Sequence, residues 1–169
     1  MKQLAKAGIF TALIVVGAWI SIPIGPVPFT LQVFFVFLTA YMLGKKYGTL
    51  SIATYVLLGA IGLPVFAGFK GGAQVLIGPT GGYLLGFILG GSVIGLLSEK
   101  RENFIWYLVS GLAGLGTIYL LGVFVLNFYV HDIKKAVALG FTPFVWFDLL
   151  KLILAAIIGL RLKRLGVKQ

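Results

Sequence analysis

The sequence predicts an all-α integral membrane protein with six transmembrane helices and Pro/Gly-rich outer loops over a pocket. Hydrophobic residues make up 60% of the 169 positions, and charged residues only 11%, against roughly 25% in soluble domains. The 24 glycines suit membrane helices that pack closely. Six spans of about 20 residues would use about 120 positions. We therefore expect a single membrane domain over residues 1–169.

Charged turns or Pro/Gly-rich breaks separate six apolar segments, and each segment predicts one span. The first starts with a basic stretch but lacks a small-residue cleavage site, so it is interpreted as a span and not as a signal peptide. The second is short for a bilayer, which predicts tilting, extension towards Thr30 or shielding by neighbouring helices. The predicted spans cover residues 4–22, 31–44, 47–62, 81–97, 104–128 and 144–162.

The later spans carry further local signals. In the fourth, Gly82, Gly86 and Gly90 recur every four residues, which predicts close packing against other helices. The fifth follows a charged turn at residues 99–102. The sixth is expected to begin outside the membrane, because Thr142 and Pro143 form a suitable N-cap and first helical residue.

Basic residues predict that both termini are cytoplasmic, because cytoplasmic loops are enriched in Lys and Arg. Ten of the 14 basic residues fall on the predicted inner side, three fall outside, and one lies within a span. The inner set is Lys2, Lys6, Lys45, Lys46, Lys100, Arg101, Arg161, Lys163, Arg164 and Lys168. The outer set is Lys70, Lys134 and Lys135.

Prolines gather on the predicted outer side of the membrane. These are Pro23, Pro26, Pro28, Pro64, Pro79 and Pro143. Irregular backbone near a membrane must be buried in protein or line a wet cavity. We therefore expect an outward-facing pocket roofed by loops, the alternative being that the prolines only end helices.

Several kinds of site are excluded or disfavoured. The chain has no cysteine and a single histidine, His131, so no metal site is expected. Gly44 and Lys45 lack the earlier glycine of a P-loop, so ATP hydrolysis by this chain is not expected. The net charge of +10 is spread between apolar runs, which favours membrane orientation over nucleic-acid binding. Serine or carboxylate catalysis is not expected, because no pair of Ser with His or of Asp with Glu lies on one predicted side within the spans.

Asp148 and Lys151 are the most unusual residues, because they lie inside the last predicted span. An ionisable side chain in a membrane costs roughly 2.5–3.5 kcal/mol on insertion scales, which points to a function. Residues three apart share a helix face, and the pair offers acceptors and a donor to a polar ligand. The alternative is a structural ion pair or a lysine that snorkels to the interface.

The glycine-rich segment over residues 62–82 is the second candidate region, with seven glycines in 21 positions. Such a segment lets the backbone approach a ligand closely, although a flexible re-entrant loop is the alternative. Lys70, Gln74, Thr80 and Tyr83 could orient a ligand, and two aromatic residues, Phe66 and Phe69, could pack on its apolar part.

Small residues on the first span form a separate candidate surface. Gly8 and Ala12 are four residues apart near the predicted cytoplasmic end. Such a stripe could meet either an internal helix or a partner subunit.

Three segments resemble the BioY family, the biotin-specific substrate-binding S components of energy-coupling factor (ECF) transporters. They read IPIGPVPFTLQ over 22–32, VFAGFKGGAQVLIGPTGGYLLGF over 65–87 and GFTPFVWFDLLK over 140–151. The resemblance implies a multi-pass S component in a prokaryotic cytoplasmic membrane, with membrane lipid around it and biotin as ligand, not cofactor. It also implies a transmembrane T component and ATPase subunits as partners. Asp148 and Lys151 match the family's biotin-binding pair, and Gly8 and Ala12 its docking helix.

Other functions remain open at this point. The chain could be an S component for another small vitamin or a membrane-embedded enzyme such as a lipid-modifying transferase. A structural or assembly subunit is a third possibility, but it would leave the cost of placing Asp148 and Lys151 in a membrane unexplained.

Overall fold

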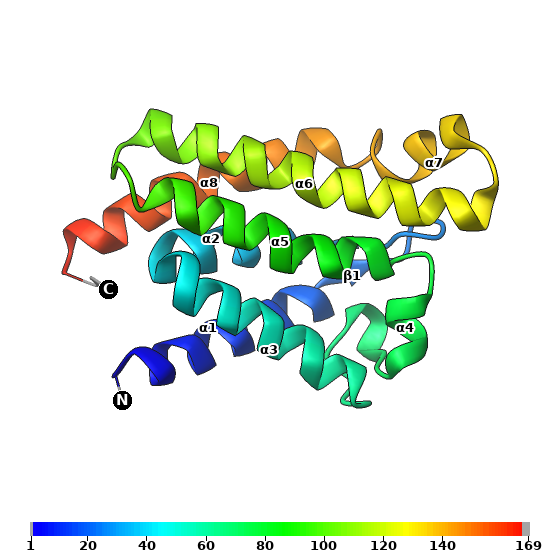
Figure 1. The fold of residues 1–169 in the computed structure, drawn as a ribbon, viewed down its shortest axis with the longest axis horizontal. Helices are drawn as coiled ribbons and strands as arrows, with labels where there is room; N and C mark the ends of the chain where they lie inside the picture. The colour runs from blue at the N-terminus through cyan, green and yellow to red at the C-terminus, as the bar shows by residue number, and fades with distance from the viewer. Residues whose placement is uncertain (1, 167–169) are drawn as a thin grey trace.

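Long helices lie side by side in one bundle, and the short elements gather at one end of it (Figure 1). A computed structural model describes residues 2–166. Both ends of the described chain lie at one end of the bundle, and α4, α7 and β1 lie at the opposite end (Figure 1). One basic residue of the predicted inner set, Lys168, lies outside the described residues.

The six predicted apolar segments correspond to the six main helices of the bundle. These are α1 (Lys2–Trp19), α2 (Gln32–Leu43), α3 (Thr49–Ala60), α5 (Gly81–Ser98), α6 (Phe104–Val130) and α8 (Val145–Arg164). Smaller elements are β1 (Ser21–Ile22), β2 (Phe29–Thr30), the π-helical turn η1 (Gly44–Gly48), the 3-10 turn η2 (Ala67–Phe69), α4 (Ala73–Ile77) and α7 (Ile133–Gly140). The described chain is mostly helical, as predicted; the exceptions are the two-residue strands β1 and β2, which pair antiparallel between α1 and α2.

The predicted boundaries are wrong at three places for local reasons. The first helix ends at Trp19 and not at residue 22, and the second does not extend to Thr30, because the strands occupy those positions. Between the second and third spans, Gly44 ends α2 with a positive φ of 67°, and the π-helical turn η1 leads into α3. The last helix begins at Val145, because Thr142 donates its hydroxyl to the Val137 carbonyl at the end of α7 and does not cap α8.

Helix α7 is an element that the sequence did not predict. The Asp132 carboxylate accepts hydrogen bonds from the backbone N–H groups of Lys134 (2.8 Å) and Lys135 (3.3 Å) and so caps its first turn. An aspartate in this position stabilises a helix start. The residues between α6 and α8 thus form a helix that lies against the bundle (Figure 1).

Two of the described helices, α5 and α6, are long and apolar enough to cross a membrane on their own. The pair α7 and α8, bent by 46°, adds a third candidate if it is taken as one span. Helices α2 and α3 have 12 residues each, or about 18 Å at 1.5 Å per residue. Six spans and cytoplasmic termini therefore stay predictions.

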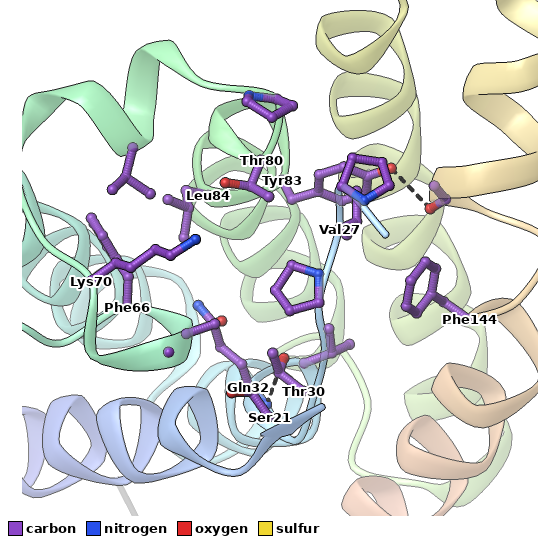
Figure 2. Close-up of a pocket in the computed structure, with 18 of the residues that line it drawn as sticks. Ser21, Val27, Thr30, Gln32, Phe66, Lys70, Thr80, Tyr83, Leu84 and Phe144 are labelled. Carbon is purple, nitrogen blue, oxygen red and sulfur yellow. Dashed lines mark hydrogen bonds between the residues drawn. The ribbon is translucent and has the colours of Figure 1, made fainter. Parts of the chain in front are cut away.

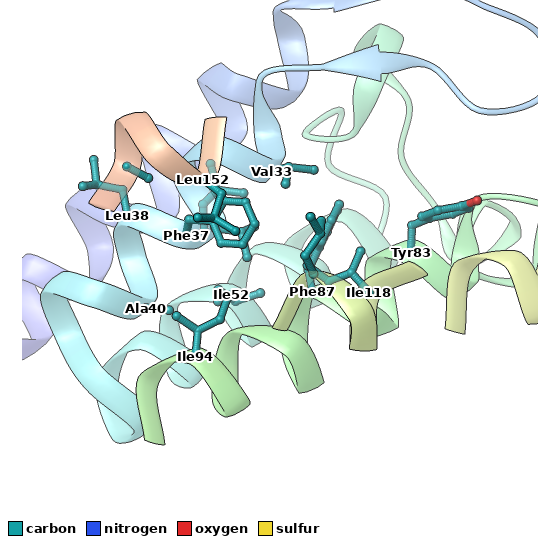
Figure 3. Packing of buried hydrophobic residues seen from close by; sticks show 14 of the residues in the cluster. Val33, Phe37, Leu38, Ala40, Ile52, Tyr83, Phe87, Ile94, Ile118 and Leu152 are labelled. Atoms are coloured by element: carbon teal, nitrogen blue, oxygen red, sulfur yellow. The ribbon is translucent and has the colours of Figure 1, made fainter. Parts of the chain in front are cut away.

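The hydrophobic core lies between α2, α3, α5, α6 and α8. Figure 3 shows Phe37, Ile52, Ile94, Ile118 and Leu152 converging there. Glycines allow α5 and α6 to approach closely, since a Cβ atom at Gly90 would lie 2.7 Å from the Gly114 carbonyl oxygen. This packing holds the walls of the cavity described next.

Candidate functional site

A cavity of about 650 Å³ opens at the end of the bundle that carries α4, α7 and the hairpin formed by β1 and β2. Its walls come from the hairpin segment, the η2–α4 segment, and helices α5, α6 and α8 (Figure 2). The structure brings all six sequence-predicted ligand residues to this cavity, namely Lys70, Gln74, Thr80, Tyr83, Asp148 and Lys151. A size of about 300–1,000 Å³ is typical of small-molecule sites.

Asp148 and Lys151 form a buried ion pair in the wall of the cavity. The Lys151 Nζ atom lies 2.7 Å from Asp148 Oδ1, and the two residues are 7% and 4% exposed. Their positions in the first two turns of α8 place both side chains on one face. A buried pair of this kind is costly to desolvate and depends on further hydrogen bonds for its charges.

Two partners that sequence reasoning missed complete this cluster. The Tyr119 hydroxyl on α6 donates to Asp148 Oδ2 at 2.6 Å. Lys151 Nζ donates to the Thr30 carbonyl at 2.7 Å and lies 4.2 Å from the centre of the Phe29 ring. The ion pair thus connects α8 to α6 and to β2.

The cluster keeps hydrogen-bonding capacity for a ligand. A carboxylate has about four lone-pair positions and an ammonium group three N–H donors. The protein uses two positions on Asp148, one on each oxygen, and two donors of Lys151. Further acceptor positions and one donor are left in the cavity wall, which suits a neutral ligand that has both N–H and carbonyl groups.

A second polar pair joins α2 to α3. Gln32, at the start of α2, lines the cavity and donates from Nε2 to the Tyr55 hydroxyl at 2.9 Å. Both residues are buried. The sequence offered one signal for Gln32, an uncharged amide at the edge of a strongly apolar run.

The remaining predicted residues differ in their environment. Tyr83 donates to the Gly140 carbonyl at 2.8 Å and so joins α5 to the end of α7. Gln74 donates to the Gly71 carbonyl at 2.7 Å. Lys70 extends towards the cavity (Figure 2) and forms no ion pair within residues 2–166. Thr80 precedes the first residue of α5.

The two predicted aromatic residues of the glycine-rich segment both line the cavity but differ in exposure. Phe66 is buried against Tyr55, whereas Phe69 is 63% exposed and packs on Trp19 with ring centres 5.2 Å apart. The Trp19 indole N–H donates to the Pro64 carbonyl at 2.9 Å. These contacts connect α1 to the segment that covers the cavity.

No metal-binding cluster of three or more His, Cys, Asp or Glu side chains occurs within residues 2–166. Gly8 and Ala12 are exposed on α1, a helix that begins at the end of the bundle opposite the cavity (Figure 1). A Cβ atom at Gly8 would meet nothing within 4 Å. The surface that contains them is therefore open in this chain.

Comparisons with known proteins point to one family. The model of the BioY family matches residues 1–167. The chain is 79% identical to the biotin transporter BioY of Thermotoga maritima over the whole of both chains, and 48% identical to the probable biotin transporter BioY of Pyrococcus horikoshii over 96% of each. It is also similar to a crystal structure of the S-component for biotin from an ECF-type ABC transporter. That match has a TM-score of 0.89 and 31% identity, and covers 96% of this chain and 91% of the other.

Proposed function

Because this chain belongs to the BioY family, we propose that it is the biotin-binding S subunit of an ECF-type transporter in a prokaryotic cytoplasmic membrane. One observation carries the proposal beyond family membership. A buried ion pair, Asp148 with Lys151, lies in the wall of a cavity large enough for a small vitamin. Its unused acceptor positions and donor match the ureido ring of biotin, which has two N–H groups and one carbonyl.

Biotin is proposed to bind with its ureido ring at the ion pair and its valerate chain towards the outer rim. Asp148 accepts from the ring N–H groups, and Lys151 donates to the ring carbonyl. Charge-assisted hydrogen bonds of this type are stronger than neutral ones. Lys70 is proposed to bind the carboxylate of the biotin valerate chain. This is supported because Lys70 lines the cavity and forms no ion pair among the described residues. Gln74, Thr80 and Tyr83 complete the proposed polar wall.

The function is tested by calorimetric titration of the purified chain with biotin, riboflavin and thiamine. We expect saturable binding of biotin alone, because the other two vitamins lack a ureido ring with two N–H groups beside one carbonyl, which is the arrangement that the ion pair fits. Binding of another vitamin in place of biotin would favour an S component of different specificity. Hydrolysis or transfer without retention of the ligand would favour a membrane enzyme.

The orientation proposed here has six spans, cytoplasmic termini and an outward-facing cavity. It is supported by ten basic residues against three on the two predicted sides and by the positive-inside rule. We expect a membrane-impermeant thiol reagent to label Lys70→Cys in intact cells, and Lys100→Cys only after permeabilisation. The chain has no native cysteine that would interfere. The reverse labelling pattern would contradict the orientation.

Energy for uptake is proposed to come from partner subunits, a transmembrane T component and ATPases. The sequence supports this, because Gly44 and Lys45 do not complete a P-loop. Gly8 and Ala12 are proposed as part of the docking surface, since both are small and exposed on α1. Small residues let membrane helices approach closely.

Replacing Gly8 or Ala12 by leucine is expected to reduce biotin uptake severalfold in cells that contain the partner subunits. Biotin binding by the isolated variant should stay unchanged, because the cavity lies at the other end of the bundle. Uptake of labelled biotin and calorimetry of the purified variants measure the two effects. Ile9→Phe, a change at an exposed position of α1 that is about 100° around the helix from Gly8, serves as the control. Equal loss of binding and uptake would assign the stripe to internal packing.

A further inference from the structure

A second hollow lies on the outside of the bundle between α6, α7 and α8, separate from the cavity proposed for biotin, with Tyr119 lining both. We name it the α6/α8 groove and define it by Leu112 to Val123 on α6, Val137 and Phe141 at α7, and Val145 and Leu149 on α8. Its volume is about 480 Å³. The three helices that form it lie together along one side of the molecule (Figure 1).

The groove has the length and chemistry of a lipid chain. Its lining side chains are all apolar except that of Tyr119, whose hydroxyl is already bonded to Asp148. From Leu112 to Val123 the groove follows α6 for eleven residue steps, or about 17 Å at 1.5 Å per residue. One leaflet accounts for half of a hydrocarbon core of about 30 Å. The groove therefore extends along about one leaflet.

Charge at one end of the groove indicates the kind of lipid. Lys134 lies one helical turn before Val137, so the two share a face of α7. Lys134 is exposed and forms no ion pair within residues 2–166. The nearby Asp132 carboxylate is used as the cap of α7. An ammonium group above an apolar groove is complementary to a phosphate with an attached acyl chain.

We propose that the α6/α8 groove binds one membrane phospholipid, with an acyl chain along α6 and its phosphate at Lys134. The proposal rests on the membrane placement proposed above but not on the identity of the transported vitamin. The bound chain covers the outer side of Tyr119, whose other side lines the biotin cavity. Phe141 lies between α7 and Tyr119, with its ring centre 4.8 Å from that of Tyr119. The lipid thus packs against the wall that positions Asp148.

Gly116 provides a variant that fills the groove without disturbing the protein. A Cβ atom at this position would meet nothing within 4 Å, so Gly116→Phe places a ring in the open groove. Gly116→Ala leaves most of the groove empty and is the matched control. Ala113→Phe adds the same ring at an exposed position of α6 that does not line the groove.

Native mass spectrometry of the detergent-purified chain, titrated with dioleoylphosphatidylglycerol, tests the proposal. We expect one tight lipid adduct for the wild type, Gly116→Ala and Ala113→Phe, and its loss for Gly116→Phe. Lys134→Glu should weaken the adduct about fivefold or more, the factor that corresponds to about 1 kcal/mol per basic residue near anionic lipid. Lys135→Glu makes the same charge change on another face and should have less effect.

Other outcomes of the titration would overturn the proposal. Dioleoylglycerol has the same chains without the phosphate, and equal binding of this lipid would remove the role of Lys134. An adduct that survives in Gly116→Phe would place the lipid elsewhere. Biotin titration of Gly116→Phe separates this proposal from the function, because loss of the lipid with retained biotin binding affects the groove alone. Loss of both in a variant with an unchanged thermal midpoint would contradict the separation of the two sites.

Discussion

Replacing Asp148 by asparagine or Lys151 by alanine is expected to weaken biotin binding at least tenfold. Each change removes a charged partner of the proposed ureido site and leaves the other charge buried, since the two residues are 4% and 7% exposed. A hydrogen bond to a charged group is worth about 1.5–3 kcal/mol, and 1.4 kcal/mol corresponds to a factor of ten in affinity. Calorimetric titration of the solubilised variants measures the loss.

The controls for this prediction come from the same helix and the same cluster. Lys163→Ala removes the other buried lysine ion pair of α8, in which Nζ lies 2.9 Å from Glu102 Oε1. Lys163 does not line the cavity, so this substitution should leave the affinity for biotin unchanged. Tyr119→Phe keeps the ring but removes one hydrogen bond to Asp148, and we expect a smaller loss. Wild-type affinity in folded Asp148→Asn and Lys151→Ala would make the pair a structural one.

The positions of the main helices could be predicted from the sequence because apolar runs and charged or glycine-rich breaks are local signals. The six predicted segments match α1, α2, α3, α5, α6 and α8 to within a few residues at most ends. The errors fall where tertiary contacts decide the structure. Residues 21–22 and 29–30 pair as strands across a proline-rich turn, and Thr142 bonds to the last turn of α7 and not to the start of α8.

The residues of the candidate site also differ in how far the sequence reveals them. Asp148 and Lys151 could be found because charge inside an apolar run is conspicuous, and their spacing of three residues predicts a shared helix face. Tyr119 could not be found from the sequence, because it is one of several aromatic residues in an apolar helix. Its contact with Asp148 depends on how α6 packs against α8. The Thr30 carbonyl belongs to the backbone, so no residue type marks it.

Helices α5 and α6 both form walls of the cavity, and their close approach keeps these walls in place. Gly90 on α5 is the position where this packing is most easily tested. A Cβ atom at Gly90 would lie 2.7 Å from the Gly114 carbonyl oxygen and 2.7 Å from Cγ1 of Ile118. Backbone cannot move aside as a flexible side chain can, so the helices must separate. Helix α5 carries Tyr83, and α6 carries Tyr119, so separation also displaces two walls of the site.

Gly90→Leu is therefore expected to lower stability by about 3 kcal/mol or more, the upper part of the range for overpacked cores. For a chain of this size the thermal midpoint should fall by roughly 6–12 °C, at 2–4 °C per kcal/mol. Biotin binding should weaken with it, because Tyr119 moves relative to Asp148. Thermal melts with and without biotin measure both effects. Gly8→Leu makes the same substitution on a helix where a Cβ atom has open space, so its midpoint should stay near that of the wild type. Equal thermal midpoints for Gly90→Leu and Gly8→Leu would show that the packing of α5 against α6 does not require glycine at position 90.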